Sequence, residues 1–283
     1  TTLVELALAS YSQYVSERAQ TRSGKCKETR MTSTTLDAPK IRRERLPLVR
    51  RELKVIEKFC PTPNLIRVVL AGEELEGFLS PSPDDNIKIF ITDEDGSSTM
   101  RSYTPRRYDA EKGELLLDFA LHQAGPATQW AIDIQVGDTA HIGGPRGSKV
   151  LEGDVERLLL IGDDTALPAM ARRVEEAEAG QAITMLASIP EAEDEQDIET
   201  PALFTPLWLH RNGAAPEDAE PFLKALETLD IPPGTFIWLA AEGQAVKAIR
   251  TYLMESRGVP RNWIKATGYW VKGKADTTAK FEE

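Results

Sequence analysis

Residues 158–169 read Leu-Leu-Leu-Ile-Gly-Asp-Asp-Thr-Ala-Leu-Pro-Ala, and this stretch decides the fold of the second half of the chain. Its four successive apolar residues predict a strand buried on both faces, and a turn then leads into a helix over 166–179. Further strands are expected at 183–189, 207–210 and 236–240, with helices at 219–229 and 244–255. Strands that alternate with helices are typical of βαβ units. We therefore predict an α/β domain with a parallel sheet over residues 153–283.

The preceding residues, 41–152, carry shorter apolar segments that Pro and Gly residues separate. Six of these segments are expected to be strands: 53–59, 65–71, 86–91, 101–104, 114–121 and 139–143. Short strands at this spacing predict a six-stranded antiparallel barrel. Residues 1–40 show only a short apolar stripe. We expect them to form an N-terminal extension that is either loosely held or docks on a partner or a membrane surface.

The composition argues against several classes of protein. The formal net charge of −11 disfavours broad nucleic-acid binding, which depends on basic surfaces. The two cysteines, Cys26 and Cys60, form no pattern typical of a disulfide framework or an iron–sulfur cluster, so redox chemistry would need an organic cofactor. No apolar run is long enough to span a bilayer and no signal-peptide pattern is present. We expect a cytoplasmic protein without integral membrane contact, most simply a monomer.

The block Arg101-Ser102-Tyr103-Thr104-Pro105-Arg106-Arg107 is the strongest local signal for a ligand. Alternation along a strand would place Arg101 and Tyr103 on one face and Ser102 and Thr104 on the other. A guanidinium can bind a pyrophosphate, an aromatic ring can cover a flat heterocycle, and a hydroxyl can bond a ring nitrogen. These are the needs of a dinucleotide that carries a flavin. A charged edge strand would explain the block equally well.

Two later blocks carry related signals. Gly125-Pro126-Ala127-Thr128 has the pattern of a helix start, whose free N–H groups can bind phosphate. An ordinary helix start is the alternative. The block 143–148, Gly-Gly-Pro-Arg-Gly-Ser, would let the backbone approach a ligand and places the positive charge of Arg146 there. It could equally be a glycine-rich corner between two domains.

In this order the blocks resemble the FAD domain of the ferredoxin-reductase superfamily, and more closely its siderophore-interacting, ferric-siderophore reductase branch. The branch-like motifs are 84–88, 125–127, 144–148, 162–169 and 268–270, within a resemblance that runs from about residue 48 to 274. The resemblance implies a FAD-binding barrel over 41–152. It also implies a Rossmann-like nicotinamide-binding domain over 153–283, whose C-terminal segment lies over the flavin.

The resemblance also implies which residues bind the cofactors. These are Arg101, Ser102, Tyr103, Thr104, Asp118, His122, Gly125, Ala127, Thr128, Gly144, Arg146, Ser148, Asp163, Thr165, Ala166, Glu242, Tyr269 and Trp270. Lys88, Arg146 and Lys265 are the positions that match the basic groups with which the family holds anionic ferric chelates. Without the resemblance, Lys88 and Lys265 would be interpreted as solvated lysines.

Several residues of the second half allow two interpretations. Asp163 and Asp164 either lie at the dinucleotide or cap the following helix, since carboxylates beside a pyrophosphate are unfavourable. Glu242 is expected to contact the ribose or the amide of a nicotinamide. Tyr269 and Trp270 either cover the flavin or close the core.

The carrier is also open between NADH and NADPH. The acidic stretch 191–197 is expected to be a solvated loop, and it would repel the 2′-phosphate of NADPH, which favours NADH. The arginines Arg172, Arg173 and Arg211 could nevertheless bind that phosphate.

The sequence therefore predicts an FAD-dependent ferric-siderophore reductase. Electrons would pass from NAD(P)H, or from a ferredoxin, through FAD to Fe(III) in a siderophore, and Fe(II) would be released for cellular iron supply. No metal ligands are expected in the protein, because the three histidines are scattered without ligand spacing. The alternatives are a flavin-dependent NAD(P)H oxidoreductase with another acceptor and a non-enzymatic siderophore-binding module.

Overall fold

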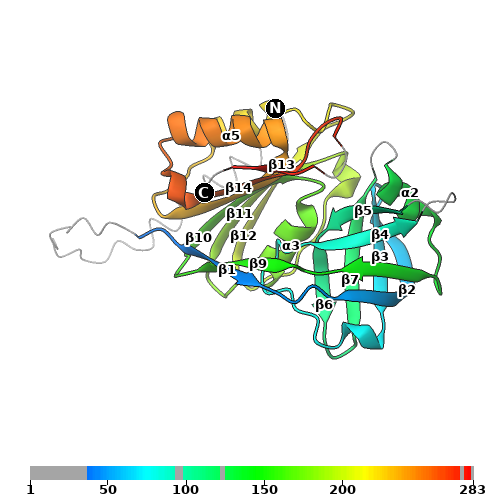
Figure 1. The fold of residues 1–283 in the computed structure, drawn as a ribbon. Helices are drawn as coiled ribbons and strands as arrows, with labels where there is room; N and C mark the ends of the chain where they lie inside the picture. Colours follow the sequence, from blue (N-terminus) through cyan, green and yellow to red (C-terminus); the bar gives the residue numbers. More distant parts are fainter. Residues whose placement is uncertain (1–36, 93–97, 122–124, 275–276, 282–283) are drawn as a thin grey trace. The chain divides into compact units, whose positions relative to one another are not determined.

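Two sheets contain most of the strands in the described part of the chain (Figure 1). The computed structural model describes residues 37–92, 98–121, 125–274 and 277–281. Residues from Ala38 onward belong to one compact unit. Most of the predicted N-terminal extension, together with His122, lies outside the described residues.

The first sheet is antiparallel and curled, with seven strands in the order β5-β4-β8-β2-β3-β7-β6. Its strands are β2 (Arg50–Thr62), β3 (Leu65–Ala71), β4 (Ile87–Thr92), β5 (Ser98–Tyr103), β6 (Pro105–Asp109), β7 (Glu114–Ala120) and β8 (Thr139–Gly143). All six strands predicted for this half are confirmed. The pattern does not predict β6, because it begins with Pro105 and continues with two arginines. A residue without an N–H is tolerated there, since β6 lies at an edge of the sheet.

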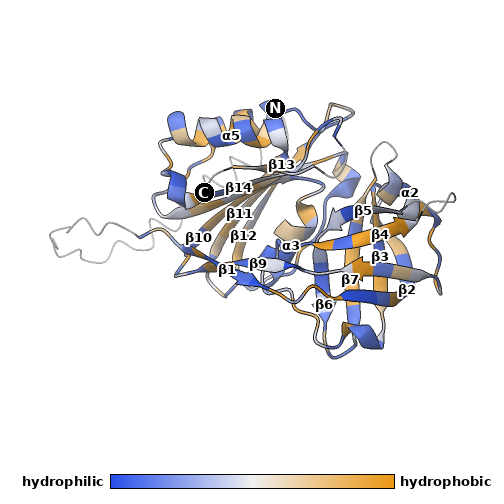
Figure 2. Ribbon diagram, viewed as in Figure 1, coloured by the Kyte–Doolittle hydropathy of each residue, from blue (hydrophilic) through white to orange (hydrophobic). Residues whose placement is uncertain are grey.

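Alternation along β2 decides which face of the curled sheet is buried. Leu53 and Val55 are 1% exposed, whereas Lys54 between them is exposed. Figure 2 shows apolar and polar residues following one another along these strands. The helix α2 (Pro126–Asp133) packs against β3, β4 and β7, and its Ala127 and Ala131 join the same core.

A separate two-stranded antiparallel ribbon is formed by β1 (Lys40–Arg45) and β9 (Gly147–Glu152), which lie before and after the curled sheet in the sequence. Neither strand is predicted by the pattern, because β1 is rich in charged residues and β9 begins within the glycine-rich motif 143–148. The pairing requires Gly147, since a Cβ at this position would lie 2.8 Å from the carbonyl oxygen of Glu44. The predicted domain boundary after residue 152 falls between β9 and β10, and it stays a prediction.

The second sheet has the order β12-β11-β10-β13-β14-β15. Its strands are β10 (Arg157–Asp163), β11 (Ala182–Ile189), β12 (Leu203–His210), β13 (Thr235–Glu242), β14 (Ile264–Trp270) and β15 (Ala279–Lys280). The first five strands of this order are parallel, as the sequence predicts, and β15 pairs antiparallel to β14. The helices are α3 (Leu167–Glu175), α4 (Glu220–Thr228) and α5 (Gly243–Glu255), and three single turns are η1 (Glu73–Leu75), η2 (Ala192–Asp194) and η3 (Arg261–Trp263).

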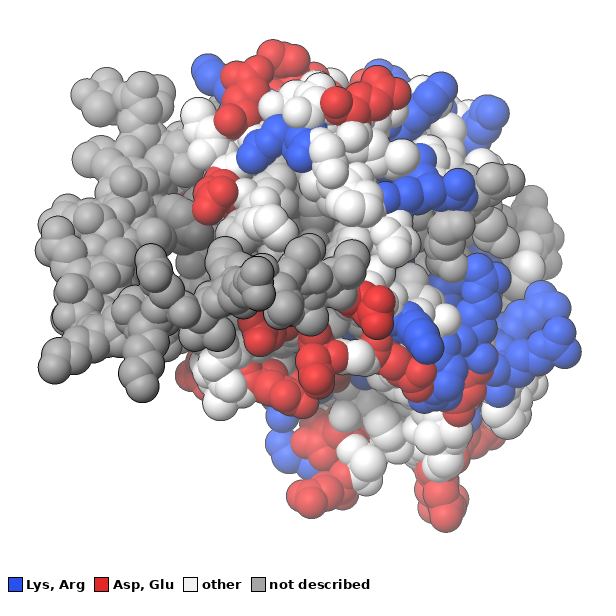
Figure 3. All heavy atoms as spheres, turned by 90° about the vertical axis from the view of Figure 1, so that its left-hand side faces the viewer, with Lys and Arg blue, Asp and Glu red and all other residues white. Residues whose placement is uncertain are grey.

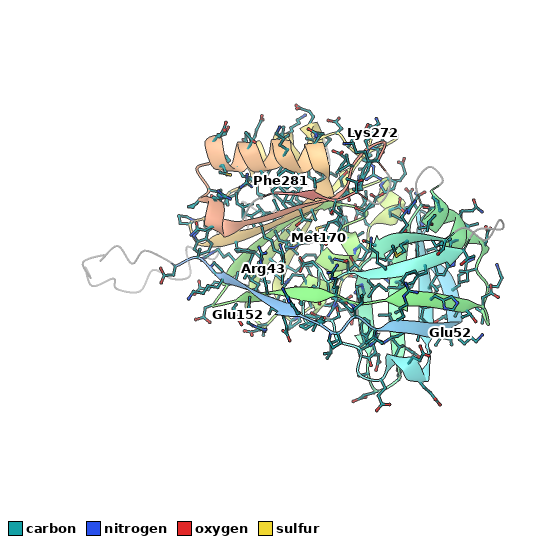
Figure 4. All side chains as sticks on the ribbon, in the orientation of Figure 1. Arg43, Glu52, Glu152, Met170, Lys272 and Phe281 are labelled. Atoms are coloured by element: carbon teal, nitrogen blue, oxygen red, sulfur yellow. The ribbon has the colours of Figure 1, made fainter. Side chains whose placement is uncertain are left out.

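The parallel sheet is covered on both faces, which explains the uninterrupted apolar run of β10. Leu158 and Leu160 share a core with α3, whereas Leu159 and Ile161 share another core with α4 and α5. Met170 of α3 and Phe281 belong to these opposite faces (Figure 4). No helix in the described residues has the length and apolar character that crossing a bilayer requires.

The acidic stretch 191–197 differs from the solvated loop that the sequence predicts. Its residue Asp194 is 3% exposed, and its carboxylate accepts hydrogen bonds from the backbone N–H (2.9 Å) and the side-chain amide (2.8 Å) of Asn64. Asn64 lies between β2 and β3, so this carboxylate joins the parallel sheet's η2 turn to the curled sheet. Its neighbours Glu193 and Glu195 are exposed.

Replacement of Asp194 by alanine should lower the free energy of unfolding by about 1–3 kcal/mol, because the donors of Asn64 lose their acceptor. Urea denaturation monitored by circular dichroism measures this change. Glu193→Ala is the matched control on the same turn and should have an effect close to zero. Equal effects of the two substitutions would contradict the role assigned to Asp194.

Candidate functional site

Three of the predicted motifs meet on neighbouring strands of the curled sheet. In the ladder, Lys88 of β4 lies opposite Ser102 of β5 on one side and opposite Gly143 of β8 on the other. The segments 84–88, 101–104 and 143–148 are far apart in the sequence but adjacent in the structure. The strand order β5-β4-β8 therefore brings these three segments together into a candidate site, whereas the sequence shows only the order in which they occur.

The Arg101 block occupies the end of β5. Arg101 is half-buried, and its guanidinium donates to the carbonyl of Met100 (2.8 Å). No carboxylate among the described residues forms an ion pair with it. The ring of Tyr103 lies 4.3 Å from that of Phe119, and burial raises the pKa of its phenol well above the usual value. Arg101 is thus a cation without a described neutralising partner.

Thr104 corrects the simple alternation expected from the sequence. The strand β5 ends at Tyr103, so Thr104 lies outside it and is buried, whereas Ser102 is exposed. The two hydroxyls therefore do not share a face. The break arises because Pro105 begins a new strand that pairs with β7 at the opposite edge of the sheet order.

The predicted helix start is confirmed at α2. Gly125 is its N-cap, Pro126 occupies the first turn, and no side chain caps the helix. The first intrahelical bond of this turn runs from the N–H of Gln129 to the Gly125 carbonyl, so the N–H groups of Ala127 and Thr128 precede the ladder of bonds. Thr128 is 4% exposed. This start has the geometry that binds phosphate groups.

The glycine-rich corner connects β8 to β9. Gly144 has φ +93°, a left-handed conformation that favours glycine, and its carbonyl accepts a hydrogen bond from Arg51 (3.2 Å). Arg146 is exposed. The hydroxyl of Ser148 is buried beside the Asp85 carboxyl, and a hydrogen bond from Ser148 acts against the burial that raises the pKa of Asp85.

Lys265 is not the solvated lysine that its sequence context alone would suggest. It is 3% exposed, and its ammonium lies 2.6 Å from the carboxylate of Asp84 and 3.3 Å from the carbonyl of Lys149. The indole N–H of Trp238 also donates to Asp84 (3.3 Å). A chelate would reach Lys265 only if this ion pair separated. Its predicted role in substrate binding stays a prediction, and the sequence did not reveal Asp84 as its partner.

Asp118 also has protein partners for its carboxylate. It forms a two-pronged ion pair with Arg67 (2.6 and 2.7 Å), and the Nε of Arg106 lies 3.7 Å away. The Asp118 side chain is 1% exposed. These contacts give it a role in joining β3 to β7, and none of them leaves an oxygen directed to solvent. A cofactor contact for Asp118 therefore has no support from its surroundings.

Asp163, at the end of β10, is fully buried and does not cap α3. One carboxylate oxygen accepts from the N–H (3.0 Å) and the hydroxyl (2.5 Å) of Thr165. The other accepts from the N–H of Glu242 (3.1 Å) and the indole of Trp270 (2.9 Å). Burial, and then the nearby charge of Asp164, raise the pKa of Asp163 to about 6. The adjacent Ala166 is the N-cap of α3 and is completely buried.

Glu242 and the C-terminal aromatic residues surround the same point. Glu242 is 1% exposed and caps α5 by accepting from the N–H groups of Gln244 and Ala245. Its other oxygen accepts from the N–H of Lys272 (3.2 Å). The ring of Tyr269 meets Trp238 edge-on at 6.0 Å, and burial raises the pKa of its phenol. These contacts show that Tyr269 packs in the core; a contact with flavin stays a prediction for it and for Trp270.

Of the three arginines considered for a 2′-phosphate, only Arg211 lies at the carboxyl ends of the strands. Arg172 is buried and donates to the Ser80 hydroxyl (2.8 Å), the Ser80 carbonyl (2.6 Å) and the Pro105 carbonyl (3.1 Å). Burial lowers the pKa of Arg173, and Asp84 opposes this effect. Arg211 instead pairs with Asp164 at 2.6 Å.

Comparison with known proteins identifies the family. Residues 155–273 match the family described as siderophore-interacting protein, and residues 54–99 and 92–149 match the siderophore-interacting FAD-binding domain. The ferric vibriobactin reductase ViuB of Vibrio cholerae is 30% identical over 247 residues, which cover 79% of this chain and 90% of that protein. The chain belongs to the siderophore-interacting protein family.

Two further proteins are similar to this chain, one compared by sequence and one by structure. The NADPH-dependent ferric-chelate reductase of Escherichia coli K12 is 30% identical over 242 residues, covering 78% of this chain and 92% of that protein. A siderophore utilization protein from T. fusca has a TM-score of 0.78 at 34% identity, covering 84% of this chain and 98% of that one. The resemblance inferred from the sequence is confirmed, as is the succession of a curled antiparallel sheet and a parallel sheet.

The ion pair between Asp84 and Lys265 should make stability sensitive to acid. Burial acts to raise the pKa of Asp84, but Lys265 outweighs it and the net pKa is lowered. A carboxyl with a lowered pKa stabilises the fold above its unfolded pKa of about 3.9, and this contribution is lost as the pH falls through the folded pKa. The difference in Tm between the wild type and Asp84→Asn should therefore be largest near neutral pH and disappear in acid.

The partner substitution provides the control for this prediction. Lys265→Met leaves the Asp84 carboxylate buried without its cation and should destabilise strongly, whereas adding Asp84→Asn should restore part of the loss. Thermal unfolding of the four proteins at several pH values measures both effects. Additive effects of the two substitutions would show that the pair is not coupled.

Proposed function

We propose that this protein is an FAD-dependent ferric-siderophore reductase that takes electrons from a nicotinamide dinucleotide. The observation that carries the proposal is the half-buried Arg101 of β5, for which the described residues provide no carboxylate. Lys88 of β4 lies opposite Ser102, its neighbour on β5, and also opposite Gly143 of β8. Family membership and the names of the relatives as ferric vibriobactin reductase and ferric-chelate reductase support the same reaction.

The residues present fit FAD. Arg101 would bind the pyrophosphate with its guanidinium, and the start of α2 would offer the N–H groups of Ala127 and Thr128 to phosphate oxygens. FAD, when bound, supplies the conversion of a two-electron hydride transfer into single-electron steps.

The substrate would be a ferric chelate that carries negative charge. Lys88 lies opposite Gly143, and Arg146 lies in the glycine-rich corner that follows it. Both would attract the chelate, although the whole chain has a net charge of −11. Figure 3, which shows another side of the molecule, has Lys and Arg side chains gathered along one side of the view and acidic groups beside them, so the net charge does not describe every part of the surface. The chain's residues would hold the chelate, and the iron would keep its own oxygen ligands. Reduction releases the iron because hard oxygen ligands hold Fe(II) less tightly than Fe(III).

Three finer points belong to the same proposal. The donor is NADH or NADPH, with a ferredoxin as the alternative donor. The protein acts as a monomer, and it acts in the cytoplasm. Gel filtration of the purified protein, with and without FAD, measures whether it is a monomer. Cell fractionation measures whether it is in the cytoplasm.

Anaerobic spectroscopy tests the central reaction. The purified protein should show a flavin spectrum, which NADH or NADPH should bleach and a ferric siderophore should restore, with Fe(II) trapped by a chelator. Rapid turnover of quinones, together with failure to reoxidise with every ferric siderophore tried, would overturn the proposal in favour of another acceptor. A colourless protein that takes up no added FAD would favour a binding module.

Substitution of Arg101 by glutamine should weaken FAD binding by about tenfold or more, because charge-assisted hydrogen bonds to the pyrophosphate are lost. Fluorescence titration of the apoprotein with FAD measures the change. Arg107→Gln is the matched control, since Arg107 lies in the same block but is exposed on β6. Equal affinities of the two variants would argue against Arg101 as a FAD ligand.

Neutralising the basic groups beside the corner tests the substrate site. The double substitution Lys88→Gln with Arg146→Gln should raise KM for an anionic ferric chelate several-fold and leave KM for a neutral chelate unchanged. Flavin content should stay at the wild-type level. An equal rise for both chelates would indicate a structural effect in place of charge recognition.

A further inference from the structure

The carboxyl ends of β10, β11 and β12 form the edge where a sheet of this kind binds nucleotides. The strand order changes direction between β10 and β13, and ligands of such sheets bind outside the carboxyl ends at this point. In the register, Asp163 lies opposite Ser188, and Ser188 opposite Leu209. The residues that follow these three positions therefore project from one edge of the sheet.

Arg211 is fixed at this edge by contacts to β11 and to the turn after β10. Its backbone N–H donates to the carbonyl of Ile189 (2.9 Å), and its guanidinium donates to the carbonyl of Ser188 (3.0 Å). The same guanidinium lies 2.6 Å from the carboxylate of Asp164. The side chains of Arg211 and Asp164 are 10% and 11% exposed. The end of the second strand of a dinucleotide-binding sheet is where the adenosine ribose is read, and an arginine nearby accommodates a 2′-phosphate.

The charge of Arg211 is already neutralised where a 2′-phosphate would need it. One N–H group of Arg211 donates to the carboxylate of Asp164, and another donates to the carbonyl of Ser188. Two exposed glutamates follow shortly after β11: Glu191, which precedes η2, and Glu193, which lies in it. A phosphate with two negative charges would meet a guanidinium whose charge Asp164 already offsets, and it would lie close to the carboxylate of Asp164. A free 2′-hydroxyl, which is uncharged, meets neither obstacle.

We infer that the Asp164–Arg211 pair determines the dinucleotide specificity of this protein, and that it selects NADH over NADPH because Asp164 occupies the cation that a 2′-phosphate requires. The inference rests on the proposed function in one respect, namely that a nicotinamide dinucleotide is the donor. It concerns the adenosine end of the ligand, so it is independent of the iron chelate.

The test uses the purified flavoprotein and the oxidised dinucleotides NAD⁺ and NADP⁺, which bind without reducing the flavin. Isothermal titration should show that the wild type binds NAD⁺ at least tenfold more tightly than NADP⁺. Asp164→Asn keeps the shape of the side chain and removes its charge, so it should tighten NADP⁺ binding about tenfold and leave NAD⁺ binding unchanged. Adding Arg211→Gln to Asp164→Asn should abolish this gain.

Glu193→Gln is the control for a general loss of negative charge, since Glu193 is exposed near the same edge. It should change NADP⁺ affinity less than Asp164→Asn does. Asp164→Ser is a second variant that also frees Arg211, and circular dichroism of each protein establishes that it is folded. NADP⁺ binding by the wild type as tight as NAD⁺ binding, or an unchanged ratio in both Asp164 variants, overturns the inference.

The result can be separated from failure of the proposed function. Absence of binding by either dinucleotide would overturn the inference, even if a ferric siderophore still reoxidised a chemically reduced flavin. Conversely, normal dinucleotide selectivity with no reaction toward any ferric chelate would overturn the proposed acceptor and leave the specificity pair intact.

Discussion

The hydrogen bonds accepted by the buried carboxylate of Asp163 hold together the carboxyl ends of the strands in the parallel sheet. Its two oxygens accept from Thr165, Glu242 and Trp270, which belong to the turn after β10 and to the ends of β13 and β14. An acceptor-only group suits this point, because Thr165, Glu242 and Trp270 all direct donors at it. The same contacts explain why Asp163 does not cap α3. Its position fixes three strand ends and the C-terminal segment relative to one another.

Ion pairs and hydrogen bonds of charged side chains also connect elements that lie far apart in the sequence. Arg106 of β6 binds Glu175 of α3, and Arg172 of the same helix binds Ser80 and Pro105. Lys265 reaches Asp84 across the two sheets. Each of these side chains is largely buried, so each needs its partner to offset desolvation. A consequence is that several charges of this acidic protein are structural and leave only a subset for ligands.

The distinction between structural and available charge organises the proposed chemistry. Where the curled sheet brings its three motifs together, Arg101 and the exposed Arg146 are the cations proposed to bind the anionic groups of FAD and of a ferric chelate, and Lys88 lies on the neighbouring strand β4. At the other sheet, Arg211 is held by Asp164 and therefore suits a ligand without an added phosphate. The fold thus attracts negative charge at one place and limits it at another.

The sequence by itself determined the two sheets, their strand directions and the family, because period-two and βαβ patterns and the ordered motifs are local properties of the chain. It also located Arg101, the start of α2 and the corner at Gly144. Only the tertiary structure decided that Lys265 is paired with Asp84, that Asp194 is buried against Asn64, and that Asp163 and Glu242 serve neighbouring N–H groups. Lys265 and Asp84, Asn64 and Asp194, and Asp163 and Glu242 lie far apart along the chain, so no local pattern encodes these contacts, whereas the bonds from Gln244 and Ala245 to Glu242 are local.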